Sequence, residues 1–188
     1  MLDLLRPFAY LTVRHQSRLP LWINVVLPTA LAIAASLAAA LLGEKLNVFG
    51  PQGLLDRLLS FVQTLTGFYI AALAAVSSFN SPHLDRVMPT PAPTMRVKHN
   101  GVLQDVPATR RRFLTSMFAY LTALSFIFSL AAIFALTVAT PLGDRLAPDA
   151  LAIFHWLAFG GFLLAAFQLT CITFWGLFYL GERMLTPD

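Results

Sequence analysis

The sequence has little of what enzymes and metal proteins are usually built from. It contains one cysteine in 188 residues, so one chain can form no internal disulfide, and Cys171 alone cannot hold zinc. It has no P-loop, no dinucleotide-binding glycine pattern and no nucleophile elbow. We therefore expect a protein that is not an enzyme and that has no catalytic residue, no metal site and no cofactor.

Histidines would be the natural candidates for acid–base chemistry, but the four in the sequence are scattered and match no metal-ligand spacing. His83 lies two residues before Asp85, and no nucleophile is close to this pair in the sequence. An enzyme that acts on lipid remains an alternative, and it would depend on His83 or His155.

Charged residues are also scarce, at 12% of the sequence against about 25% in typical soluble domains. None lies in the middle of a long apolar run, although proton-coupled transporters usually need such a residue. This absence argues against an active transporter. Gln63 and Gln168 do lie inside apolar runs, and we expect them to hydrogen-bond between helices. The alternative is a pore lined by Gln63, Thr66, Ser77 and Gln168.

Apolar residues, by contrast, are abundant: 57% of the sequence is hydrophobic and the mean hydropathy is +0.71. They form four runs, at about 21–42, 58–79, 113–140 and 151–180. Each run reaches the ~20 residues that a helix needs to cross ~30 Å of hydrocarbon. We predict an all-α integral membrane protein in which residues 1–188 form one domain of four transmembrane helices. Because the first and last connections are short, we expect the spans that they join to be antiparallel neighbours.

Positive charges define the orientation. Ten of the thirteen Lys and Arg residues lie at the N-terminus, in the segment 80–112 or at the C-terminus, and three lie in the other connections. Since positive residues favour the cytoplasmic side, we predict a multi-pass protein of the bacterial inner membrane with both termini and the segment 80–112 in the cytoplasm. Arg110, Arg111 and Arg112 directly precede the third run, and we expect them to contact lipid headgroups.

The cytoplasmic segment 80–112 is the longest polar stretch. Its first part, 80–93, has four prolines and is predicted to be extended and stiff. Asn100 and Gly101 give the strongest short hairpin signal, so we predict a small β-hairpin between the second and third helices, with Thr109 as the N-cap of the third. An isolated two-stranded hairpin is marginally stable in water, so we expect it to lean on a neighbouring protomer or a partner protein.

We expect this hairpin to bind a cytoplasmic protein, since its basic residues suit an acidic surface or an added β-strand. Its basic groups are too few to predict direct binding of nucleic acid. The residues proposed for partner binding are Arg96, Lys98, His99, Asn100 and Gly101.

Small residues at a spacing of four follow one face of the second predicted helix, at Gly67, Ala71 and Ala75. Such rows let helices approach closely in membranes. Together with the unsupported hairpin, this row predicts a homo-oligomer, and we expect a tetramer.

The four spans, the short loops and the proline-rich segment that leads to Arg110-Arg111-Arg112-Phe113 resemble the membrane subunit of the bacterial anti-phage Kiwa system. The likeness covers the topology of the whole chain and includes no diagnostic motif. It implies an oligomer that senses phage insult at the membrane and holds a cytoplasmic DNA-binding partner. We therefore predict an oligomeric scaffold or sensor subunit, and a pore-forming effector that depolarises the membrane is the alternative.

Overall fold

A computed structural model of the protein confirms four helices of membrane-spanning length. It describes residues 2–13, 18–42, 46–89, 92–99, 102–143 and 145–180. The first long helix comprises α1 (Leu19–Leu21), the π-helical turn η2 (Trp22–Val26) and α2 (Leu27–Leu42). The others are α3 (Leu54–Ser78), α5 (Arg110–Gly143) and α6 (Pro148–Phe178). Each is long and apolar enough to cross a membrane.

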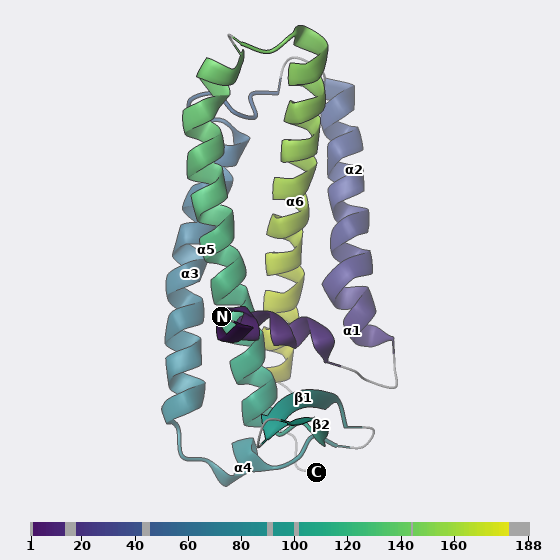
Figure 1. The fold of residues 1–188 in the computed structure, drawn as a ribbon, viewed down its shortest axis with the longest axis vertical. Helices are drawn as coiled ribbons and strands as arrows, with labels where there is room; N and C mark the ends of the chain where they lie inside the picture. Colours follow the sequence, from purple (N-terminus) through teal and green to yellow (C-terminus); the bar gives the residue numbers. More distant parts are fainter. Residues whose placement is uncertain are drawn as a thin grey trace.

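The long helices form a row, as Figure 1 shows: α3 packs along α5, α5 along α6, and α6 along α2. The expectation that spans joined by short connections are neighbours is confirmed for α5 and α6. It is wrong for α2, whose long contact is with α6 instead of α3. The connection 46–53 contributes Phe49, whose ring stacks on His155 of α6 with centroids 5.0 Å apart. The connection from α2 to α3 therefore contacts α6, the helix that packs along α2.

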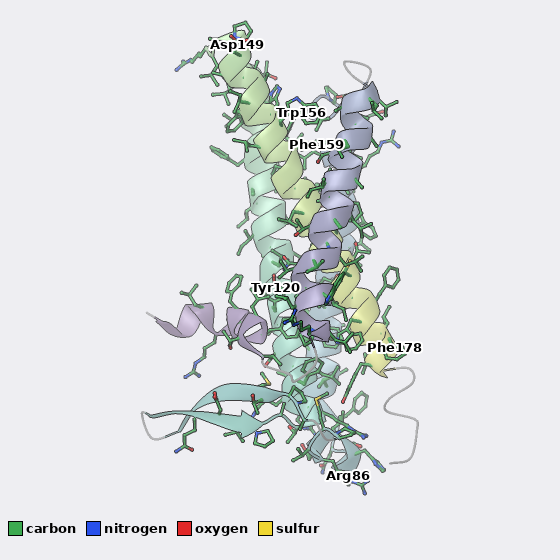
Figure 2. The ribbon with its side chains drawn as sticks, turned by 90° about the vertical axis from the view of Figure 1, so that its right-hand side faces the viewer. Arg86, Tyr120, Asp149, Trp156, Phe159 and Phe178 are labelled. Carbon is green, nitrogen blue, oxygen red and sulfur yellow. The ribbon has the colours of Figure 1, made fainter. Side chains whose placement is uncertain are left out.

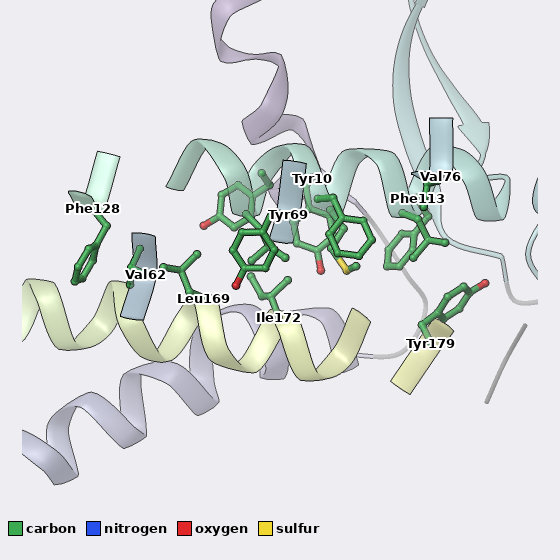
Figure 3. Packing of buried hydrophobic residues seen from close by; sticks show 14 of the residues in the cluster. Tyr10, Val62, Tyr69, Val76, Phe113, Phe128, Leu169, Ile172 and Tyr179 are labelled. Carbon is green, nitrogen blue, oxygen red and sulfur yellow. The ribbon is translucent and has the colours of Figure 1, made fainter. Parts of the chain in front are cut away.

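The core runs between α3, α5 and α6. Figure 3 shows Val62 and Tyr69 of α3 facing Leu169 and Ile172 of α6. The outer faces of the helices stay apolar as well, and they are exposed. Their large exposed side chains include Leu37, Leu130, Phe134, Leu157 and Phe174. Apolar surface of this extent needs a partner or a bilayer to cover it.

The predicted hairpin is confirmed. Strand β1 (Thr94–His99) pairs antiparallel with β2 (Val102–Pro107), with Thr94 opposite Pro107 and His99 opposite Val102. The base of the hairpin packs on its own chain, because Met95 and Ala108 are buried in the core. Strand β1 also contacts η1 (Leu2–Thr12), a 3₁₀ helix that crosses the row of long helices (Figure 1). The hairpin thus has a support within one chain that the sequence did not predict.

The proline-rich segment is only partly extended. Pro82–Asp85 forms the short helix α4, so the prediction that 80–93 is extended is wrong there. Proline favours the first position of a helix, because its φ angle is already helical and no N–H is needed there. Further along, Met88 donates its backbone N–H to the carbonyl of Ala108 at 3.1 Å. This bond holds the segment against the base of the hairpin.

Helix α5 begins where its cap was predicted. The hydroxyl of Thr109 accepts a bond from the backbone N–H of Arg112 at 3.3 Å, which confirms Thr109 as the N-cap. The helix therefore starts three residues before the predicted span, and Arg110–Arg112 form its first turn.

Candidate functional site

A proline inside the first long helix leaves one backbone carbonyl without its usual hydrogen-bond donor. Pro28 has no N–H, so the carbonyl of Asn24, four residues earlier, cannot receive the usual helical bond. The helix adopts the π-helical turn η2 at this point, and Gln168 of α6 donates from Nε2 to the Asn24 carbonyl at 2.8 Å. Gln168 thus supplies the hydrogen bond that Pro28 removes. The prediction that Gln168 bonds between helices is confirmed.

The side chain of Asn24 joins the same polar cluster. It is 7% exposed, and its Oδ1 accepts a bond from the hydroxyl of Tyr10 at 3.3 Å. Tyr10 lies on η1 and stacks on Tyr120 of α5, with ring centroids 5.5 Å apart. Burial raises the pKa of Tyr10, so its hydroxyl stays protonated and available as a donor. Asn24 therefore connects η1 to the first long helix, and Gln168 extends the connection to α6.

The three arginines at the start of α5 have three different environments. Arg110 is buried, at 4% exposure, and Arg112 is exposed. Arg111 binds both carboxylate oxygens of Asp85, from Nε at 2.7 Å and from Nη2 at 3.1 Å. Its Nη1 also donates to the carbonyl of Val76 at 2.8 Å, near the end of α3. Contact with lipid headgroups was predicted for all three arginines and stays a prediction. It fits Arg112 best, because Arg112 is the exposed one of the three.

Replacing Arg111 with alanine is expected to lower the thermal stability of the protein more than the same change at Arg112. Arg111 joins α4, the start of α5 and the end of α3, where a cation also suits the helix dipole. The comparison needs only thermal unfolding in detergent, followed by tryptophan fluorescence. Equal effects of the two substitutions would show that the bonds of Arg111 contribute nothing to stability.

Acid should weaken the same connection. The hydrogen bond from Arg111 holds the pKa of the Asp85 carboxyl below its ordinary value of 3.8. Because the pKa of Asp85 is lower in the folded protein than in the unfolded chain, the ion pair stabilises the fold at pH values above the ordinary pKa. This stabilisation is lost as the pH falls through the pKa of the folded state. The protein should therefore lose thermal stability as the pH falls below about 4. The Asp85→Asn variant should lose less over the same pH range, because it lacks the carboxyl group that becomes protonated.

The residues predicted to bind a partner lie on the hairpin. Arg96 is the register partner of Asp105, and Lys98 is the partner of Leu103. Since successive positions of a strand alternate between faces, positions 96 and 98 share one face. Position 99 falls on the other face, where Met95 is buried. The side chains of Arg96, Lys98 and His99, and the whole of Asn100 and Gly101, lie outside the described part of the structure.

The small-residue row of α3 faces outward. Gly67 and Ala71 are exposed, Ala75 is half-buried, and a Cβ added at Gly67 would meet no atom within 4 Å. Gly67 and Ala71 therefore do not serve packing among the described helices of one chain, and contact between chains stays a prediction. Among the glycines of the described long helices, Gly176 of α6 allows close packing inside the chain, and the sequence interpretation missed it. A Cβ there would overlap the end of the Met117 side chain.

The candidates for chemistry are not brought together. His83 is exposed, and the carboxylate of Asp85 beside it is engaged by Arg111. His155 lies on α6 and stacks on Phe49. Within the described ranges, no group of three or more His, Cys, Asp or Glu residues could hold a metal ion.

The residues considered for a pore also separate. Gln63 and Ser77 are exposed on α3, whereas Gln168 is engaged with Asn24 between helices. Thr66 donates to the carbonyl of Val62 in its own helix at 2.9 Å. One chain therefore does not assemble these four residues into a polar channel.

Comparison with known proteins gives no further guide, since no family model, no curated protein and no solved structure matches the chain.

Proposed function

We propose that this protein is a subunit of a homo-oligomeric scaffold or sensor in a bacterial inner membrane, and that it recruits a cytoplasmic protein. The recruiting surface is the hairpin end, which comprises η1, α4, β1 and β2. The observation that carries the proposal is the gathering of these elements at one end of the long helices (Figures 1 and 2). Among the described residues, the opposite end carries only the connections 46–53 and 145–147.

The distribution of charge supports a cytoplasmic location for the hairpin end. Arg86 and Arg112 are exposed there, next to elements that also carry the basic positions 96 and 98 of β1. Arg57 and Arg145 belong to the opposite end. This is the asymmetry that the positive-inside rule associates with cytoplasmic ends. The resemblance to the Kiwa membrane subunit favours a narrower role in anti-phage defence, with a DNA-binding protein as the recruited partner.

An outward-facing glutamine supports the homo-oligomer. Gln63 lies four residues before Gly67 on the same row of α3, it is exposed, and it forms no hydrogen bond with any described residue. Leaving an amide without a partner in hydrocarbon costs roughly 1–3 kcal/mol or more. A second copy of the chain would supply the partner, and Gly67 would let the two backbones approach. The interface proposed for the oligomer is therefore the row Gln63, Gly67, Ala71 and Ala75.

The row predicts that Gly67→Leu combined with Ala71→Leu converts the purified protein from an oligomer into mostly monomer. Bulky side chains would hold the backbones apart, and Gln63 would lose its partner. Native mass spectrometry in mild detergent gives the masses, and a tetramer is expected for the unmodified protein. Gly161→Leu is the matched control, because Gly161 is also exposed and a Cβ there also meets nothing within 4 Å. A monomeric unmodified protein would contradict the proposal.

Orientation can be tested with single cysteines in a Cys171→Ser background. Gln104 on β2 and Gln52 in the first connection are both exposed. We expect a membrane-impermeant maleimide to label Gln52→Cys in intact spheroplasts, and to label Gln104→Cys only after the membrane is permeabilised. The reverse pattern would place the hairpin end outside the cytoplasm and remove the proposed site of recruitment.

A pore remains the second candidate, because Ser60, Gln63 and Thr64 are all exposed on α3. In an oligomer this polar face would line a channel if it pointed inward. Vesicles that contain the protein and release an enclosed dye would favour the pore, whereas a scaffold would leave the dye in place.

A further inference from the structure

A cavity of about 150 Å³ lies where η1, the first long helix, the end of α6 and the residues Met88, Pro89 and Pro93 meet. Figure 3 shows Tyr10, Phe113 and Tyr179, which belong to its wall, turned toward the same region. Other wall residues are Ile23, Trp175 and Phe178. A space of this size holds a group about as large as benzene. Tryptophan and tyrosine around it mark the level of a membrane interface, where the glycerol region of lipids is found.

The wall is apolar apart from a few groups, and Asn24 is the most informative of them. Its carbonyl accepts from Gln168, and its Oδ1 accepts from Tyr10. Its Nδ2 donates to no described residue, although the side chain is only 7% exposed and lines the cavity. An amide N–H can donate to a neutral acceptor that reaches it. The cavity therefore offers the Asn24 amide as a donor inside a mostly apolar wall.

These features define the ligand. The described wall residues include no charged side chain, so none of them would offer a counter-charge to a phosphate group. A water molecule needs two to four polar partners, and an aromatic wall is a poor source of them. A ligand with a neutral acceptor and a short apolar segment fits this cavity. The acceptor would receive a hydrogen bond from Asn24 Nδ2, and the apolar segment would pack against the apolar wall. An ester carbonyl with the first carbons of an acyl chain has this chemistry.

We propose that the cavity binds a glycerophospholipid, with an acyl-ester carbonyl accepting a hydrogen bond from Asn24 Nδ2. The first part of the acyl chain lies among Ile23, Trp175 and Phe178, and the headgroup remains outside the cavity. The lipid in this site bridges η1 and α6, so it fixes the hairpin end relative to the long helices. This inference does not depend on the proposed recruitment of a protein.

The test compares two photoactivatable probes of phosphatidylglycerol that differ only in their linkage. One has an ester-linked chain and the other an ether-linked chain, and both carry a diazirine near the linkage. The full chain is reconstituted in vesicles of phosphatidylethanolamine and phosphatidylglycerol that contain one of the probes. After illumination, mass spectrometry measures the adducts on Ile23, Trp175 and Phe178.

We expect the ester probe to label these residues about fivefold more than the ether probe, which corresponds to one neutral hydrogen bond. Asn24→Leu should make labelling by the two probes equal, since it removes the donor. Tyr10→Phe keeps Nδ2 and should keep the preference. Ser36→Leu, in a separate groove between α2 and α6, should also keep it.

Equal labelling of the unmodified protein by the two probes would overturn the proposal, and that comparison needs no variant to fold. An ester preference that survives Asn24→Leu would overturn it as well, because the preference would then arise from another group.

Discussion

Replacing Gln168 with leucine is expected to lower the free energy of unfolding by about 1–3 kcal/mol, the usual cost of leaving a buried polar group without its partner. The group left alone is the carbonyl of Asn24, which receives the Gln168 amide at 2.8 Å. In the bilayer that we propose around these helices, no water is available to replace that bond. Unfolding in mixed detergent, followed by fluorescence of the three tryptophans, measures the change.

A double-mutant cycle separates this cause from a general loss of packing. Pro28→Ala restores a backbone N–H that can reach the Asn24 carbonyl, so Gln168→Leu should cost much less in that background. Gln104→Leu is the chemical control, because it removes an equal amide from an exposed position of β2. An equal cost of Gln168→Leu with and without Pro28 would show that the proline does not create the demand for this bond.

Reversing the charge of the hairpin should have the largest effect on function. We expect Arg96→Glu together with Lys98→Glu to weaken capture of the proposed cytoplasmic partner by at least about tenfold, since unlike charges across the proposed interface would become like charges. Affinity is measured by co-purification of the partner from the native host at increasing salt. Membrane insertion and oligomer mass should not change, because the long helices are untouched.

Two further variants define what the hairpin contributes. Asn100→Ala with Gly101→Ala should also reduce capture, since a two-residue turn favours glycine or asparagine at these positions. Arg145→Glu reverses an exposed charge at the opposite end and should leave capture unchanged. Full capture by both hairpin variants would reduce the hairpin to a connector and move the activity into the spans.

The sequence predicted the elements better than their arrangement. Four apolar runs of sufficient length predict four helices, and Asn100-Gly101 predicts the hairpin, because both signals are local. The pairing of α2 with α6 could not be predicted, since the apolar residues surround these helices and no single face indicates the neighbour. The start of α3 at Leu54 depends on a turn in which the Asn47 side chain accepts from Gly50 N–H at 2.8 Å.

The polar cluster around Asn24 was missed, although the sequence contains a signal for it. Pro28 requires that the carbonyl of Asn24 find a donor outside its own helix, and Gln168 was already expected to bond between helices. The sequence could not predict that α2 packs along α6, which is the contact that brings Gln168 to the carbonyl of Asn24. The support of the hairpin by η1 was missed because the contact of η1 with β1 joins elements that are far apart in the chain.

Photocrosslinking in living cells of the native host tests the central claim most directly. A photoreactive amino acid replaces Lys98 on the hairpin or, as the matched position, exposed Arg145 at the opposite end. Position 98 should give an adduct with one cytoplasmic protein, and Arg96→Glu should abolish it, whereas position 145 should give none. An adduct with a cytoplasmic protein at position 145, or none at position 98, would contradict recruitment by the hairpin end.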